Sequence, residues 1–194
     1  MRIGLVALIA ALALGGCTTS TPPDAPAVPV FTSARPEAGR ERTVPDSCDA
    51  VATLDDLSRI LATFVTGPVQ RVVGVPQDNI GRTARLDCYY GVPAGQPTSA
   101  APVWIGLAGY VDDGSARERV AATVADARAA TGTVGVNDVA VGSDRGVLIR
   151  SANWMLVATR GRTTVVVQAV PALVRENDAG LILGQVADFA LTGR

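Results

Sequence analysis

The sequence predicts an α+β domain, a mainly antiparallel sheet of about six strands with helices packed on it as a layered α/β sandwich. Three observations favour this class. Segments rich in Val, Ile, Tyr and Trp are separated by short loops, which is typical of consecutive antiparallel strands. Helical patterns stand before, between and after these segments, so helices are available to cover the sheet. The chain is 48% hydrophobic but only 4% aromatic, which indicates a core built mainly from aliphatic side chains.

The first predicted element is a helix over 53–64. Thr53 is its expected N-cap, and Asp55 and Asp56 suit the positive end of the helix dipole. Apolar residues recur there at helical spacing and form one face: Leu54, Leu57, Ile60, Leu61 and Phe64. Three β-branched or aromatic stretches then predict strands: 71–75, 85–92 and 103–111. A loop rich in proline, over 93–102, separates the last two of these strands.

The second half of the domain repeats the order of helix and then strands. Ser115 and Glu118 match a capping box, which predicts a helix from there to about Ala130. Its inward face is expected to carry Val120, Val124 and Ala127. Three further strands follow as a meander: 147–150, 153–159 and 163–170. A last helix over 178–191 is expected to turn three residues toward the core: Ile182, Val186 and Phe189.

The N-terminus has the pattern of a bacterial export signal. Arg2 precedes an apolar run of about twelve residues, which is too short to cross a bilayer and fits a signal peptide. Leu14-Gly15-Gly16-Cys17 resembles a lipobox, which implies cleavage before Cys17 and lipidation of its thiol. The sequence therefore predicts a signal peptide over 1–16, a lipidated Cys17 with a Thr/Pro-rich tether over 17–45, and one globular domain over 46–194. The alternative is a plain secretory signal with an incidental cysteine.

The remaining two cysteines, Cys48 and Cys88, form an even pair in a domain that is expected to be exported. An oxidising compartment favours a disulfide between them. It closes a loop of about 41 residues, worth roughly 4 kcal/mol in the chain-entropy model. The alternatives are a redox pair or a metal site. The spacing differs from that of a Cys-x-x-Cys motif, and two thiolates without histidine make a poor zinc site.

The composition excludes several kinds of chemistry. The chain has no histidine, and all 17 basic residues are arginines, so histidine-based triads and metal sites, lysine Schiff bases and P-loops are ruled out. A net charge of −1 indicates no general attraction to nucleic acid. The pairs Asp55-Asp56 and Asp112-Asp113 are best explained by their places at helix starts, because neighbouring side chains diverge. We expect no cofactor and no metal.

The aromatic residues of the predicted strands are the candidates for a ligand site. Trp104 and Tyr110 are six positions apart, and an even spacing places both on one face of their strand. Tyr89, Tyr90 and Trp154 complete the set. Core filling explains these five side chains most simply, and a ligand-facing cluster is the alternative. The arginines around the last hairpin form a second candidate, as an anion-binding edge or a solvated rim: Arg150, Arg160 and Arg162.

Several of these features together resemble a recurrent pattern of actinobacterial lipoproteins. They are the lipobox, the tether, Cys48 before the first helix, Cys88 on a strand, and the segment from Val136 to Thr164 and its following valines. These families are mostly domains of unknown function, and some relatives resemble the PsbP/Mog-like layered fold or the sensor domains of mycobacterial kinases. The likeness covers 46–194 and implies the fold and the compartment. It transfers no catalytic or binding residue.

We therefore expect a non-enzymatic lipoprotein on the outer, extracytoplasmic face of the cell membrane. It would contact the membrane through its lipid anchor and bind an envelope component, whether lipid, glycan or protein, in a pocket lined by the aromatic residues. The alternative is an accessory or scaffold lipoprotein of a membrane complex, without a small ligand. A carboxylate-based hydrolase is a third hypothesis, and it requires two carboxylates within about 10 Å of each other in a cleft.

Overall fold

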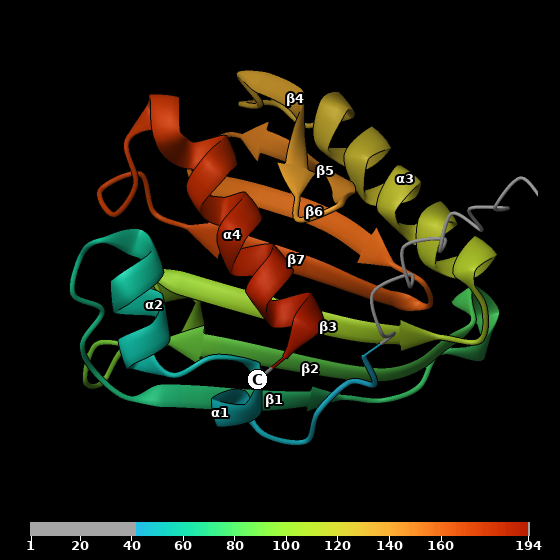
Figure 1. The fold of residues 1–194 in the computed structure, drawn as a ribbon, viewed down its shortest axis with the longest axis horizontal. Helices are drawn as coiled ribbons and strands as arrows, with labels where there is room; N and C mark the ends of the chain where they lie inside the picture. The colour runs from blue at the N-terminus through green and yellow to red at the C-terminus, as the bar shows by residue number, and fades with distance from the viewer. Residues whose placement is uncertain (1–41, 194) are drawn as a thin grey trace, which may run out of the picture. The chain divides into compact units, whose positions relative to one another are not determined.

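Seven antiparallel strands form one sheet in the computed structural model, which describes residues 42–193. Their order across the sheet is β1-β2-β3-β7-β6-β5-β4, so the two halves of the chain meet where β3 pairs with β7 (Figure 1). The strands are β1 (Val69–Gly74), β2 (Arg82–Tyr90), β3 (Val103–Tyr110), β4 (Gly135–Val141), β5 (Asp144–Arg150), β6 (Trp154–Arg160) and β7 (Thr163–Ala169). The predicted antiparallel sheet is confirmed, with one strand more than expected.

Helices cover both faces of this sheet, which makes the fold a layered α+β sandwich. They are α1 (Cys48–Val51), α2 (Leu54–Leu61), α3 (Asp113–Ala129) and α4 (Ala179–Thr192). Adjacent residues of β6 show the two faces. Leu156 packs in a cluster with residues of α1, α2 and α4, whereas Val157 packs with Val124 of α3. Because neighbouring side chains of a strand point to opposite faces, α3 lies on the face away from the other three helices.

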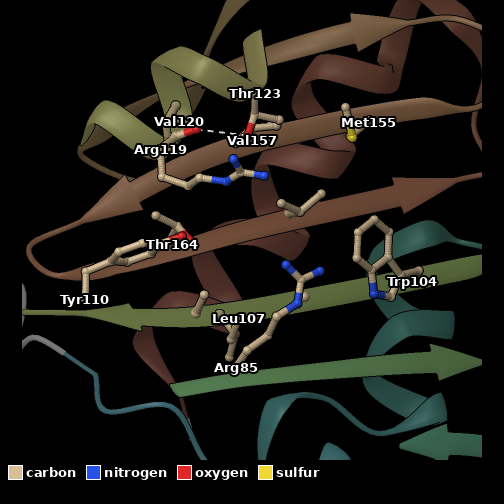
Figure 2. Close-up of a pocket in the computed structure, with 13 residues that line it drawn as sticks. Arg85, Trp104, Leu107, Tyr110, Arg119, Val120, Thr123, Met155, Val157 and Thr164 are labelled. Carbon is tan, nitrogen blue, oxygen red and sulfur yellow. Dashed lines mark hydrogen bonds between the residues drawn. The ribbon is translucent and has the colours of Figure 1, made fainter. Parts of the chain in front are cut away.

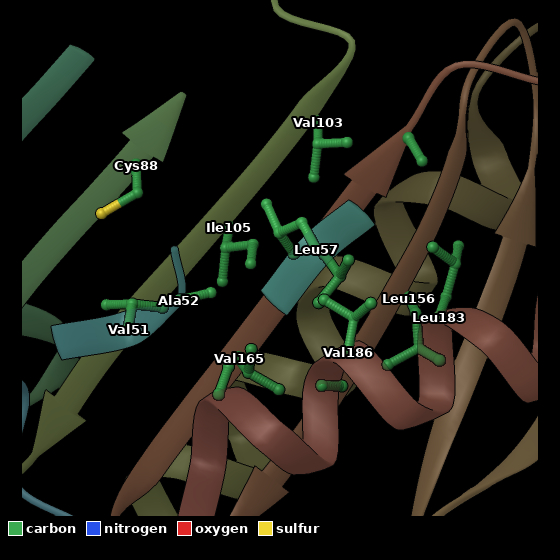
Figure 3. Close-up of a cluster of buried hydrophobic side chains, with 14 of the residues drawn as sticks. Val51, Ala52, Leu57, Cys88, Val103, Ile105, Leu156, Val165, Leu183 and Val186 are labelled. Carbon is green, nitrogen blue, oxygen red and sulfur yellow. The ribbon is translucent and has the colours of Figure 1, made fainter. Parts of the chain in front are cut away.

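The larger core lies between the sheet and the helices α1, α2 and α4. Figure 3 shows Leu57 of α2 and both Leu183 and Val186 of α4 beside Ile105 and Val165 of the sheet. Each of these five side chains is at most 1% exposed. Burial of such a side chain contributes about 1.5–3 kcal/mol. This face therefore supplies most of the apolar stabilisation.

The opposite face of the sheet is only partly covered. α3 packs on β3, β5, β6 and β7, and it buries Ile149 and Val157 with its own Val124. Val72 of β1 faces the same side and is 45% exposed. Arg85 and Tyr89 of β2 are half-buried on this side. The boundary between the covered and the open part of this face is where the candidate site lies.

The disulfide predicted from the sequence is present. Cys48 and Cys88 are joined with a Cα–Cα distance of 5.5 Å, which ties the start of α1 to the C-terminal part of β2. The Tyr90 hydroxyl donates a hydrogen bond to the Cys48 carbonyl at 3.1 Å and reinforces this link. Both cysteines are buried in the main core. Their surroundings are those of a structural disulfide.

The additional strand is β4, which the sequence does not single out. It lies at the edge of the sheet, pairs only with β5 within the described residues, and leaves Asn137 and Asp138 exposed. Strand prediction depends on clear apolar alternation, and a half-exposed edge strand with polar residues shows little of it. The strand count was therefore too low.

Two helix ends differ from the prediction. α3 begins at Asp113, and the Asp112 carboxylate caps it by accepting a hydrogen bond from the Ser115 backbone at 2.7 Å, so the predicted N-cap at Ser115 is wrong. α2 ends at Leu61 because Ala62 takes a left-handed conformation with φ 51°. Phe64 consequently leaves the helix and is 89% exposed instead of facing the core. The other predicted inward residues of α2, α3 and α4 pack in the cores.

The predicted signal peptide, the lipidation site Cys17 and the tether up to residue 41 lie outside the described residues. Of the last tether residues, Arg42 donates a hydrogen bond to the Ala190 carbonyl at 2.6 Å and Val44 packs against the main core. Within residues 42–193, no helix combines the length and the apolar character that a membrane crossing requires.

Candidate functional site

A pocket of about 120 Å³ lies between α3 and the sheet (Figure 2). Its floor is apolar and comes from three strands: Ala108, Met155, Val157 and Val166. One wall belongs to α3 and contains Arg119, Val120 and Thr123. The opposite side contains Arg85 of β2 and Trp104 of β3, and Tyr110 closes one end. The pocket thus combines an apolar floor with two aromatic rings and two guanidinium groups.

The alternation of β3 explains why its aromatic residues meet in this pocket. Val103, Ile105 and Leu107 point into the main core, so Trp104, Gly106, Ala108 and Tyr110 point to the face of α3. The structure accordingly brings Trp104 and Tyr110 to one pocket, on the shared face that their spacing predicts. Tyr110 packs beside Ala116 at the start of α3.

Asp87 organises the sheet side of the pocket. Its carboxylate accepts two hydrogen bonds from Arg85, from Nε at 2.6 Å and from Nη2 at 3.0 Å. It also accepts one from the Trp104 indole Nε1 at 3.1 Å. The Asp87 side chain is only 8% exposed. A paired, bidentate geometry of this kind fixes both the guanidinium and the indole in place.

Gly106 makes room for this arrangement. It pairs with Asp87 across the two strands, and a Cβ atom at position 106 would lie 2.7 Å from the Asp87 Oδ1 and 3.1 Å from the Trp104 ring. Both distances are shorter than normal contacts, so any side chain there displaces the carboxylate or the indole. The missing side chain lets the carboxylate of β2 and the indole of β3 meet above the sheet.

Tyr89 extends the aromatic surface beyond the pocket. It lies directly across from Trp104 in the register of β2 and β3, and the two rings stack with centroids 6.0 Å apart and an interplanar angle of 12°. Burial raises the pKa of the Tyr89 phenol, and the nearby charge of Asp87 raises this pKa further. Tyr89 therefore stays a neutral hydrogen-bonding group beside the ion pair at physiological pH.

The other two aromatic candidates lie on the opposite face of the sheet. Tyr90 is fully buried in the main core, and Trp154 is buried in the same cluster. Burial raises the pKa of Tyr90 strongly, because the phenolate would be desolvated. The two residues fill the core, which leaves Trp104, Tyr110 and Tyr89 as the aromatic residues at or beside the pocket.

The two arginines of the pocket differ in their electrostatic state. The hydrogen bond to Asp87 raises the pKa of Arg85, so this guanidinium is charged and ion-paired. Arg119 is exposed on α3 and forms no ion pair within the part of the chain that the structure describes. Of the residues that the structure describes, none of those lining the pocket carries a carboxylate. The net charge presented to a ligand is positive.

The arginines proposed from the sequence as an anion-binding edge do not gather in one place. Arg150 and Arg160 lie at opposite ends of β6 and its partner, about 20 Å apart at the rise of a strand. Arg160 is a buried structural group that binds Asp144 at 2.6 Å and Asp188 at 2.8 Å. Burial opposes its charge, yet the two hydrogen bonds outweigh burial and raise its pKa. The edge hypothesis is therefore wrong for Arg150 and Arg160.

The pocket arginines were not identified from the sequence, although a signal exists. Along β2 the residues Arg85, Asp87 and Tyr89 occupy alternate positions, and the buried Leu86, Cys88 and Tyr90 occupy the others. This period of two indicates a polar face on which Arg85 and Asp87 carry opposite charges. Arg119 has no comparable signal, because its place beside the pocket depends on how α3 packs.

The acidic pairs hold helix starts, as predicted. Asp56 and Thr53 form the capping box of α2, and Asp112 caps α3. Within residues 42–193 no group of three His, Cys, Asp or Glu side chains is placed to hold a metal ion.

No family model and no curated protein matches this sequence. Among solved structures, the chain is similar to the extracellular domain of PknH from Mycobacterium tuberculosis, with 11% sequence identity and a TM-score of 0.49. The match covers 78% of this chain and 98% of that one. A similarity at this level assigns neither a family nor a function to this chain.

The geometry of the pocket suits binding more than bond-breaking chemistry. An apolar floor holds an apolar group, and the arginine and tyrosine side chains at the rim orient a polar one. Beside the pocket, the Asp87 carboxylate already accepts hydrogen bonds from Arg85 and Trp104, so it is not free to act as a general base.

Proposed function

We propose that this protein is a non-catalytic binding module of the cell envelope, carried on the outer face of the membrane by acyl chains on Cys17. Its ligand site is the pocket between α3 and the sheet. The observation that carries this proposal is the convergence of Trp104, Tyr110, Arg85 and Arg119 around an apolar floor. Such a combination of an apolar floor with a few oriented polar groups is the usual composition of a small-molecule site.

The disulfide supports the compartment. Cys48–Cys88 is formed within the chain and buried, and disulfides of this kind persist in oxidising compartments outside the cytoplasm. The lipobox of the sequence supports attachment to the membrane, because acyl chains on a lipidated cysteine anchor a protein durably.

Lipidation is tested by labelling in a bacterial host that processes lipoproteins. We expect the full chain to incorporate an alkyne-labelled fatty acid and Cys17→Ala to incorporate none, because the Cys17 thiol is the acceptor. Cys48 and Cys88 are joined to each other and serve as internal controls. Equal labelling of the two proteins would show that acylation does not occur at Cys17.

The ligand site is tested by native mass spectrometry of the full chain purified from such a host. We expect a non-covalent mass that is lost in Thr123→Phe, because a phenyl ring at this position of α3 fills the pocket. The matched control is Ala125→Phe, which adds the same ring to an exposed position of the same helix. A ligand retained equally by both variants would place the site elsewhere. A protein without any bound mass would favour the accessory role without a small ligand.

A further inference from the structure

We infer that the ligand of this pocket carries an oxyanion, a phosphate or carboxylate, on a short apolar or aromatic group, and that Arg85 and Arg119 bind the oxyanion together. This inference rests on the proposed function, since it names the chemical class of ligand for the same pocket. It combines three properties of the pocket: the sign of its charge, the orientation of its donors, and its volume.

The charge at the pocket is of one sign. Among the described residues that line it, Arg85 and Arg119 are the only ones with charged side chains. Asp87 forms an ion pair with Arg85 but does not line the pocket, so within residues 42–193 no carboxylate oxygen lines the space for a bound group. A second hollow on the far side of Arg119 contains Asp78 and Glu118, and neither forms an ion pair with Arg119. An anion therefore meets attraction without a competing carboxylate.

Arg85 is held in a fixed orientation. It donates its Nε and one Nη2 hydrogen to Asp87, and the carboxylate is held in turn by the Trp104 indole. The remaining N–H groups of the guanidinium are available at the edge turned away from Asp87. A donor that is already ordered loses little side-chain entropy when a ligand binds.

Arg119 faces Arg85 across the pocket. Figure 2 shows its side chain extending from α3 toward the space above the sheet, while Arg85 rises from the opposite side. Within the described residues Arg119 forms no ion pair, so no carboxylate compensates its charge and none has to be displaced when a ligand binds. Two guanidinium groups on opposite walls are suited to the several oxygens of a phosphate or carboxylate.

The volume limits the apolar part of the ligand. A buried apolar cavity of about 150 Å³ accommodates benzene, and this pocket has about 120 Å³. Its floor of Met155, Val157 and Val166 offers only apolar contact. The pocket is smaller than that cavity, so it takes a short hydrocarbon segment or part of one ring, with the charged group at the rim between the two arginines.

The test separates the charge from the apolar group by using three probes: phenyl phosphate, phenol and inorganic phosphate. They are titrated into the ¹⁵N-labelled full chain in phosphatidylcholine nanodiscs, and the indole N–H resonances of Trp104 and Trp154 are followed. Trp154 lies in the core on the other face and is the internal control. We expect phenyl phosphate to shift the Trp104 resonance, to bind at least about tenfold more tightly than either fragment, and to weaken as salt is added.

The variant that tests the arginine pair is Arg119→Gln, with Arg117→Gln as its matched control. Both residues are exposed on α3, and Arg117 lies outside the pocket, where it pairs with Asp113. Loss of a charge-assisted hydrogen bond predicts about a tenfold weaker binding of phenyl phosphate to Arg119→Gln. Phenol binding should be the same in both variants.

Two failures are distinguishable. If phenol and phenyl phosphate bind equally well, or if the two variants lose phenyl phosphate equally, the ligand is not an oxyanion held by Arg119, and the pocket itself still stands. If no probe shifts the Trp104 resonance, the proposed site is wrong as well. Replacing some phosphatidylcholine by phosphatidylglycerol identifies the source: a Trp104 shift without added probe indicates a lipid headgroup, and its absence indicates a soluble anion.

Discussion

Asp87 determines the geometry of the pocket although it does not line it. Its carboxylate is nearly buried and accepts three hydrogen bonds from two side chains that do line the pocket. A buried carboxylate is costly unless it is paired, and here the pairing itself orients Arg85 and Trp104. The stability of β2 and the shape of the site therefore depend on the same charge.

Asp87→Asn is expected to lower the free energy of unfolding by about 2 kcal/mol, because Arg85 loses its ion pair while the amide oxygen keeps the indole contact. Urea denaturation of the full chain measures the change, and Asp138→Asn, an exposed carboxylate of β4, is the control. Equal midpoints for the two variants would mean that the Arg85–Asp87 pair contributes no net stability.

Tyr90 predicts an alkaline limit to stability. Burial raises its pKa in the folded state well above the value of about 10 of an exposed tyrosine. The unfolded chain therefore releases this proton first, and stability that is fully present below about pH 10 is lost as the pH rises toward the folded pKa. When urea midpoints are measured as the pH rises through this range, the midpoint of Tyr90→Phe should fall less than that of the wild type. A parallel fall in both proteins would assign the alkaline loss to other groups.

At the scale of the elements, capping determines where the helices begin. The capping box of α2 satisfies backbone N–H groups that have no partner inside the helix, with the Thr53 hydroxyl accepting from Asp56 N at 3.2 Å and Asp56 accepting from Thr53 N at 3.0 Å. α2 is short, so this cap represents a large part of its local stability.

Thr53→Ala should lower the free energy of unfolding by about 1 kcal/mol, since the first turn of α2 loses the hydroxyl cap. Thermal and urea unfolding of the full chain measure this loss. Thr66→Ala removes the same atoms from an exposed position outside the helices and should have little effect. A similar loss in both variants would show that the cap is not the cause.

The elements that were predictable are those whose own residues carry the signal. The helix at Thr53 and the strand containing Cys88 have strong patterns and lie where expected. β4 has a weak pattern because it is a half-exposed edge strand. Asp112 and Ser115 both fit an N-cap in sequence, and only the path of the chain after β3 selects Asp112.

The site was predictable only in part, for a different reason. Trp104 and Tyr110 share a strand, so their common face follows from local spacing. The position of Arg119 against Arg85 depends on the packing of α3 on the far strands, which local sequence does not encode. Trp154 and Tyr90 have the same residue types as the pocket aromatics, and their burial depends on which face the helices α2 and α4 cover.

At the scale of the molecule, the disulfide joins the N-terminal segment to the sheet. It links residues separated by 40 positions, so reducing it restores considerable freedom to the unfolded chain. Cys88 points into the core, whereas its neighbours Asp87 and Tyr89 point to the open face. The disulfide therefore fixes the position of β2, the strand that contributes Arg85 to the pocket.

A double variant, Cys48→Ala with Cys88→Ala, is expected to be less stable by about 4 kcal/mol in the chain-entropy model. Urea denaturation without reductant measures the difference. Treating both proteins with reductant is the control. It should lower the free energy of unfolding of the wild type toward that of the variant and leave the value of the variant unchanged. If reductant added to the unfolded wild type leaves its stability unchanged, Cys48 and Cys88 are not joined by a disulfide.

The order of strands also governs how the chain reaches this fold. β3 acquires its second neighbour only when β7 is available, some sixty residues later along the chain. Contacts this distant in sequence form slowly. During synthesis the first three strands emerge well before β7, so β3 has an unpaired and largely apolar edge throughout that interval. A chain cut before Thr163 keeps this open edge permanently, which is the condition under which strands of different molecules pair and aggregate.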